Sequence, residues 1–169
     1  MNSPQEHAFS MVEVTLAIGV AAFCLLAVFG LLPVAQTSRQ NATEQSVMSH
    51  ITSEIVSDLN ATRTSPTSTQ TSPRFALTVG PPGTGTSVQT LFFRGGGEVI
   101  GPPNTDAAGV DPSPRYRATI FLTPPSADER IATIGRILLT WPAMADPSSA
   151  ATPSKYNGSL ETFIGLDRN

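Results

Sequence analysis

The stretch Ala8-Phe9-Ser10-Met11-Val12-Glu13 begins the part of the chain that decides the fold. The residues that follow, 14–35, contain no charged side chain, and Thr15 carries their only hydroxyl group. A helix of roughly 20 such residues spans the hydrocarbon core of a bilayer. The sequence therefore predicts a helix over residues 9–35 that is able to cross a membrane, with the Glu13 carboxylate at its front edge.

This segment has three interpretations. The first is a plain membrane anchor. The second is a secretory signal peptide, but its apolar core would be only about 7–15 residues long and would follow a positively charged region. The third explains Glu13, because a carboxylate at the membrane centre costs about 2.5–3.5 kcal/mol, and less near the edge. Such a group is rarely found in a membrane without a partner.

Residues 8–17 resemble the prepilin cleavage and methylation motif of type IV pilins and type II secretion pseudopilins. The resemblance implies that a peptidase on the cytoplasmic side cuts between Ala8 and Phe9 and methylates the new amino terminus. It also implies that Glu13 pairs with the Phe9 ammonium of a neighbouring subunit. Two features depart from the family pattern: Ala8 stands where Gly is usual, and residues 1–7 contain no Lys or Arg.

The second half of the chain carries a further resemblance. Residues 116–125, 139–143 and 166–169 are similar to the Verrucomicrobia/Chthoniobacter cassette protein B family, a group of pilin-like proteins. These motifs contain no catalytic set. The two resemblances together imply a pilin-like fold of the α+β class, in which a long N-terminal transmembrane and amphipathic helix packs on a small antiparallel β-sheet.

Length and composition agree with one domain beyond the helix. The chain has 169 residues, of which only 14% are charged, and it contains 15 Pro and 13 Gly. This composition favours a loop-rich β domain, and the single cysteine, Cys24, excludes an intrachain disulfide. The expected organisation is a leader (1–8), a transmembrane and assembly helix (9–35), its amphipathic continuation (36–59), a Ser/Thr/Pro-rich surface loop (60–73) and an extracytoplasmic β domain (74–169).

Two features of the expected helix follow from its sequence. Pro33, with Gly30 nearby, predicts a bend or a local opening, because proline removes a backbone hydrogen bond. Five apolar side chains beyond it fall within an arc of about 120° at helical spacing, and Asp58 interrupts that arc. This stripe is expected to cover the sheet; its members are Val47, Met48, Ile51, Ile55 and Leu59.

Strands are expected where the hydrophobic period changes to two. Tyr116, Ala118, Ile120 and Leu122 share one face of an alternating segment. The apolar run 137–139 predicts burial on both faces of its strand. Residues 95–97 are all glycine and predict a hairpin turn. The expected strands are residues 75–79, 88–94, 98–100, 115–123, 130–141 and 161–166.

The sequence offers little chemistry. It has no Cys/His metal spacing and no glycine-rich phosphate loop, so no enzyme activity, metal or cofactor is expected. Asp106 and Asp111 could ligate calcium, as acidic loops do in some pseudopilins, but Ca²⁺ takes about six to eight oxygen ligands and two solvated acids are the simpler interpretation. The arginines are dispersed along the chain, so no nucleic-acid partner is expected.

Two classes of function remain. One is a structural pseudopilin or minor pilin that assembles through its N-terminal helix into a type IV pilus or type II secretion-like filament. The other is a single-pass anchored, extracytoplasmic binding domain that does not polymerise. Both place the chain in a bacterial inner membrane, and the first adds a prepilin peptidase and other pilin-like subunits as partners. Glu13 discriminates between them, because only assembly supplies its carboxylate with an ammonium group.

Overall fold

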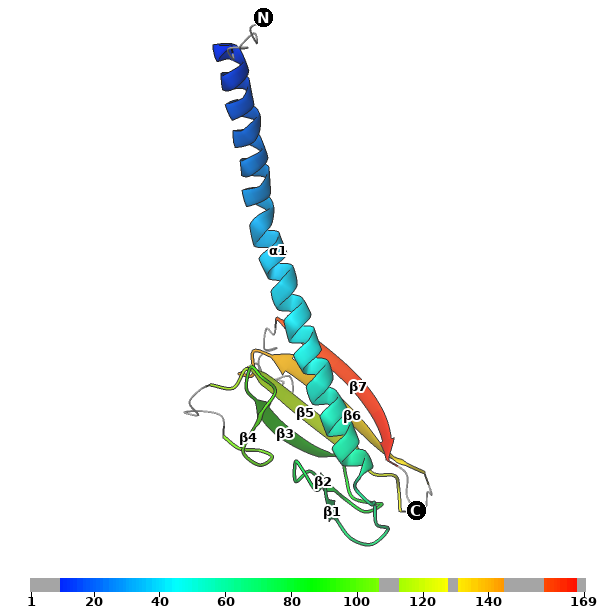
Figure 1. The fold of residues 1–169 in the computed structure, drawn as a ribbon. Helices are drawn as coiled ribbons and strands as arrows, with labels where there is room; N and C mark the ends of the chain where they lie inside the picture. The colour runs from blue at the N-terminus through cyan, green and yellow to red at the C-terminus, as the bar shows by residue number, and fades with distance from the viewer. Residues whose placement is uncertain (1–9, 107–112, 128–130, 145–156, 167–169) are drawn as a thin grey trace, which may run out of the picture. The chain divides into compact units, whose positions relative to one another are not determined.

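The computed structural model of the chain describes residues 10–106, 113–127, 131–144 and 157–166. In these ranges the chain has an α+β layout, with one long helix followed by strands that form an antiparallel sheet (Figure 1). The chain divides into two compact units, Met1–Thr43 and Glu44–Asn169. The expected fold class, a long helix with an antiparallel sheet, is confirmed at this level.

Helix α1 (Met11–Asn60) contains 50 residues, and Pro33 lies inside it. The expected opening at Pro33 is wrong, because the helix is unbroken on both sides of this residue. The Thr37 hydroxyl donates a hydrogen bond of 2.9 Å to the Pro33 carbonyl. A proline costs a helix about 3 kcal/mol, and the many intact turns on either side outweigh that local loss.

The first unit consists of the apolar part of α1. Every described side chain from 10 to 43 is exposed, including Met11, Phe23 and Leu26. Large apolar side chains that nothing covers are unusual on this scale in a water-soluble chain. The first unit is therefore a helix whose apolar surface lacks a partner among the described residues.

The second unit begins with the amphipathic end of α1. The predicted apolar stripe is confirmed: Met48, Ile51, Ile55 and Leu59 are buried, and Val47 packs against the same core. Asp58 is also buried, although its charge makes it an exception in an apolar stripe. Helix α1 crosses one face of the sheet in Figure 1, and its stripe supplies that side of the core.

The main sheet has five antiparallel strands in the order β4-β3-β5-β6-β7. A second, two-stranded sheet pairs β1 with β2. The strands are β1 (Gln70–Thr71), β2 (Thr78–Val79), β3 (Ser87–Phe93), β4 (Val99–Ile100), β5 (Tyr116–Thr123), β6 (Thr133–Trp141) and β7 (Gly158–Leu166).

The registers confirm the predicted faces of the central strands. Ala118 pairs with Leu139 and Ile120 with Ile137, and all four side chains lie in the core under α1. Leu138 points to the opposite face and is also buried, so the predicted burial of residues 137–139 on both faces is confirmed. The predicted hairpin at residues 95–97 is confirmed too, since the Arg94 N–H donates to the Glu98 carbonyl at 2.9 Å.

One expected strand is shorter than predicted. Residues 75–79 were expected to be extended throughout, but only Thr78–Val79 forms β2. Ala76 has a φ of 54°, a left-handed conformation that interrupts an extended strand. Phe75 and Leu77 are nevertheless buried in the main core, so the apolar pattern located core residues correctly while missing the turn between them.

The segment 60–73 also differs from the expectation of a surface loop. Gln70–Thr71 forms β1, and the side chains of Thr62, Thr64 and Ser72 are each at least nine-tenths buried. The composition of this segment predicted a loop with little regular structure, but it did not predict that these three side chains are buried. The hydroxyls of Thr62 and Ser72 donate hydrogen bonds to Asp58, which makes burial of these polar groups tolerable.

Candidate functional site

Glu13 lies in the first turn of α1 and is exposed. Ala8 and Phe9, the expected processing residues, lie outside the described residues. Within the part of the chain that the structure describes, no side chain bonds the Glu13 carboxylate. The structure therefore locates this acid at the entrance of the apolar segment and supplies no described cation for it.

The start of α1 places Glu13 at the third position of a helix-start pattern that the sequence reasoning did not consider. The Ser10 carbonyl accepts hydrogen bonds from the N–H groups of Glu13 at 2.9 Å and Val14 at 3.2 Å, so Ser10 occupies the cap position. Ser10-Met11-Val12-Glu13 is the Ser-x-x-Glu pattern of a capping box. A carboxylate in the first turn also interacts favourably with the positive end of the helix dipole.

The segment that follows Glu13 has the properties of a membrane span. α1 is long and apolar enough to cross a bilayer, and none of its most apolar window is buried within the chain. Cys24 lies in this segment and is exposed as a free thiol. The hydrocarbon core of a bilayer is an environment that removes such a surface from water.

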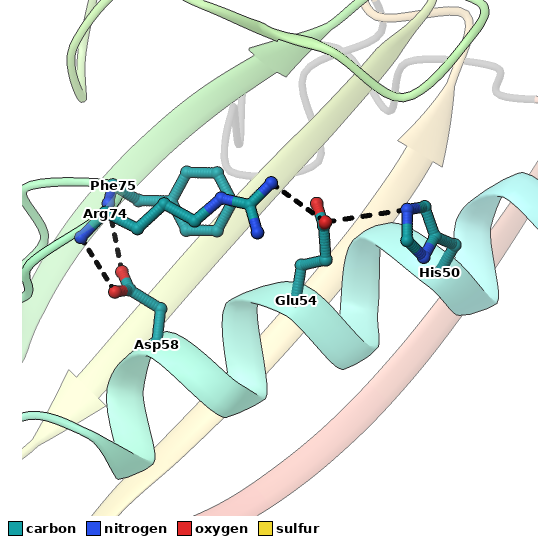
Figure 2. A network of polar contacts seen from close by, with 5 residues as sticks. All are labelled: His50, Glu54, Asp58, Arg74 and Phe75. Carbon is teal, nitrogen blue, oxygen red and sulfur yellow. Dashed lines mark hydrogen bonds and ion pairs between the residues drawn. The ribbon is translucent and has the colours of Figure 1, made fainter.

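The most developed polar site of the second unit surrounds Asp58 (Figure 2). Its carboxylate accepts hydrogen bonds from the Ser72 hydroxyl at 2.5 Å and from the N–H groups of Arg74 at 2.8 Å and Phe75 at 3.0 Å. Asp58 is only 5% exposed. This one side chain therefore fixes the return of the chain from α1 to β2. In the sequence its only signal is a charge inside an apolar stripe.

A more exposed pair of contacts lies one turn earlier on α1 (Figure 2). The Glu54 carboxylate forms an ion pair of 2.8 Å with the Arg74 guanidinium and lies 3.5 Å from His50. The side chains of His50 and Arg74 are 65% and 59% exposed. Solvent screens such contacts, so they contribute little to stability compared with the buried bonds of Asp58.

Other arginines are also engaged. Arg115 forms an ion pair with Glu44, and hydrogen bonding to that carboxylate raises the pKa of Arg115 above its ordinary value. Arg136 pairs with Glu161 across neighbouring strands at 2.5 Å and lies over the Phe121 ring at 5.2 Å. Each of these two guanidinium groups thus lies beside an acidic side chain of the second unit, and that of Arg136 also lies over an aromatic ring.

The described residues contain little that could hold a metal or perform catalysis. Asp106 is described, whereas Asp111, the other suggested calcium ligand, lies outside the described residues. Within the described ranges, no group of three or more His, Cys, Asp or Glu side chains could hold a metal ion. A cavity of about 550 Å³ lies at the end of α1, and Arg63 is the only ionisable side chain among its described lining residues. These lining residues are Leu59, Asn60, Thr62, Arg63, Thr64, Gly165 and Leu166.

Comparisons with protein-family models, with curated proteins and with solved structures found no match for this chain. The class that the fold defines is thus an α+β protein with one helix able to span a membrane.

Proposed function

We propose that this chain is a pilin-like structural subunit, a pseudopilin or minor pilin, that assembles through α1 into a type IV pilus or type II secretion-like filament. The observation that carries the proposal is the exposed apolar surface of the first unit, which starts directly at Glu13. The resemblance of residues 8–17 to the prepilin motif supports the same function. The inner membrane, a prepilin peptidase and other pilin-like subunits are the partners.

Burial of the first unit drives its insertion into the membrane. Each large apolar side chain gains about 1.5–3 kcal/mol when it is fully removed from water. Before assembly, the segment is inserted in the bilayer as a single span, with the β domain on the extracytoplasmic side. During assembly, neighbouring apolar helices replace lipid around it. The same apolar surface thus contacts lipid before assembly and neighbouring helices after it.

Glu13 supplies specificity within that apolar environment. After cleavage between Ala8 and Phe9, the new ammonium of Phe9 lies near the membrane edge, as Glu13 does. Pairing Glu13 of one subunit with Phe9 of a neighbour neutralises two charges that are costly in an apolar core. The pair thereby sets the axial register between adjacent helices.

A single-pass anchored binding domain that does not polymerise is the second candidate. The capping position of Glu13 favours it, because a first-turn carboxylate stabilises the helix without any neighbouring subunit. Under this alternative, Glu13 needs no ammonium partner and residues 1–8 need not be removed.

Processing provides the test of the proposed function. When the full chain is co-expressed with a prepilin peptidase, we expect the intact mass to fall by residues 1–8 and to rise by one methyl group. Ala8→Gly should be cut at least as fast as the natural chain, because Gly is the usual residue there. Ala8→Leu should block the cut, because a bulky side chain replaces a small one at the cleavage site.

A peptidase inactivated at its active site provides the control for host proteases. Retention of residues 1–8 in the natural chain and in Ala8→Gly, with the active peptidase present, would contradict the proposal. A cut after Ala35 would instead identify a signal peptide.

A further inference from the structure

The two edges of the main sheet differ in how far other described elements cover the backbone of the edge strand. At one edge, β4 covers only Phe92 and Phe93 of β3. Asn104 covers a further position, because its side-chain oxygen accepts from the Thr90 N–H at 2.9 Å and its own N–H donates to the Thr90 carbonyl at 2.7 Å. The β3 edge is therefore closed by short elements that leave little room for another strand.

The opposite edge, β7, has none of these protections among the described residues. All nine of its residues pair with β6 in one continuous register, from Thr133↔Leu166 to Trp141↔Gly158, and no described strand lies on its other side. Its sequence Gly-Ser-Leu-Glu-Thr-Phe-Ile-Gly-Leu contains no Pro, Lys or Arg. Natural proteins usually blunt a long edge strand with such residues or with a bulge.

The side chains of β7 define what would fit beside it. On the core face, Leu160 and Ile164 are only partly buried and pack against the main core. On the outer face, Phe163 is 66% exposed and Glu161 provides the only charge of the strand. An added strand would thus meet apolar side chains on one face and an aromatic ring with a carboxylate on the other.

We propose that the edge of β7 that no described strand covers binds an extended segment of another protein by strand addition, and that this segment carries a basic residue beside Phe163 and Glu161. β6 already presents this chemistry on the opposite side of β7: it places Arg136 opposite Phe163 and within 2.5 Å of Glu161. Strand addition draws affinity from main-chain hydrogen bonds and specificity from alternate side chains.

A second copy of β7 provides no cation for Glu161, because the strand contains no Lys or Arg. The antiparallel register that pairs all nine residues, centred on Thr162, places each Glu161 beside Phe163 of the other copy. A shift that centres the pair on Glu161 brings two carboxylates together, and like charges directly opposite are destabilising. A foreign strand with an Arg or Lys avoids this like-charge contact and provides a cation. This inference does not depend on filament assembly.

The test uses the full chain in detergent micelles and a fluorescein-labelled peptide with the sequence of β6, Thr-Ile-Gly-Arg-Ile-Leu-Leu-Thr-Trp. Fluorescence anisotropy should show saturable binding that a scrambled peptide does not reproduce. Two further peptides carry N-methyl groups on alternate amides, one set for each strand face. One of the two should bind about tenfold or more weakly, because it lacks the donors that face β7.

A charge exchange tests the side-chain part of the proposal. Glu161→Lys should weaken binding of the β6 peptide and strengthen binding of a peptide with Glu in place of its Arg. The unfolding midpoint of the variant reports that β7 remains paired with β6, because this exposed substitution should change stability little. Equal binding of both N-methylated peptides and the unmodified one would overturn the proposal. Dimerisation of the chain through β7, measured by sedimentation velocity, would also overturn it.

Discussion

Glu13→Gln is expected to leave the chain helical and membrane-inserted while it lowers entry into filaments by about 100-fold or more. Removing one member of a buried ion pair typically costs 3–5 kcal/mol, roughly a factor of 100 or more in an equilibrium. The substitution removes the charge that is proposed to pair with Phe9 of a neighbouring subunit. Immunoblots of sheared-filament and membrane fractions measure the two pools separately.

The glutamine variant separates the two roles of Glu13. Gln serves at the third helical position of a capping box as Glu does, so Glu13→Gln keeps the helix cap and removes only the charge. Ser10→Ala is the matched control, because it removes the cap side chain at a cost of about 0.5–2 kcal/mol and leaves the charge. Assembly should therefore fail in Glu13→Gln and persist in Ser10→Ala.

If Glu13→Gln assembles and Ser10→Ala fails to assemble, Glu13 acts in helix capping alone. If Glu13→Gln enters filaments as the natural chain does, with processing intact, the proposed pairing with Phe9 is wrong. The anchored binding domain then becomes the better account of the chain.

Asp58→Ala is expected to lower the free energy of unfolding of the second unit by about 3 kcal/mol, because three donors lose a charged acceptor in a buried site. Asp58→Asn keeps the shape but replaces one acceptor oxygen with a donor, so a smaller loss of about 1–3 kcal/mol is expected. Urea unfolding of the full chain, followed by the fluorescence of Trp141 in β6, measures both values.

Glu54→Gln provides the matched control on the same face of α1. It breaks an ion pair with an exposed arginine and should change the free energy of unfolding by less than about 1 kcal/mol. A loss from Glu54→Gln as large as that from Asp58→Ala would show that the exposed network, and not the buried carboxylate, holds the loop to the helix.

The sequence predicted the regular elements because their signals are local. The period of Met48, Ile51 and Ile55 identifies the buried face of α1, and the alternation from Tyr116 to Leu122 identifies the buried face of β5. Such repeating patterns arise wherever a helix or strand has one side in the core.

The polar contacts could not be predicted in the same way. Asp58 finds Ser72 and Arg74 only after the loop between them has folded back on α1, and no periodic pattern encodes that approach. Ala76 interrupts the expected strand through a left-handed conformation that alanine rarely adopts. The open edge of β7 likewise depends on strand order, which the length of each strand does not specify.

The candidate site was predicted only in part. Residues 8–17 indicated Ala8, Phe9 and Glu13 through a family resemblance, and the structure places Glu13 in the first turn of an exposed apolar helix. The Ser-x-x-Glu spacing of Ser10 and Glu13 is present in the sequence, and the structure shows that the helix begins next to Ser10, at Met11. The pairing of Glu13 with a neighbour depends on a second chain and stays a prediction.

The most direct measurement of the central claim is the intact mass of this chain recovered from the sheared-filament fraction of its native host. The account predicts that the chain is present there and begins with a methylated Phe9. Its absence from that fraction, with a chain in the membrane that retains Met1 or begins after Ala35, would contradict the account.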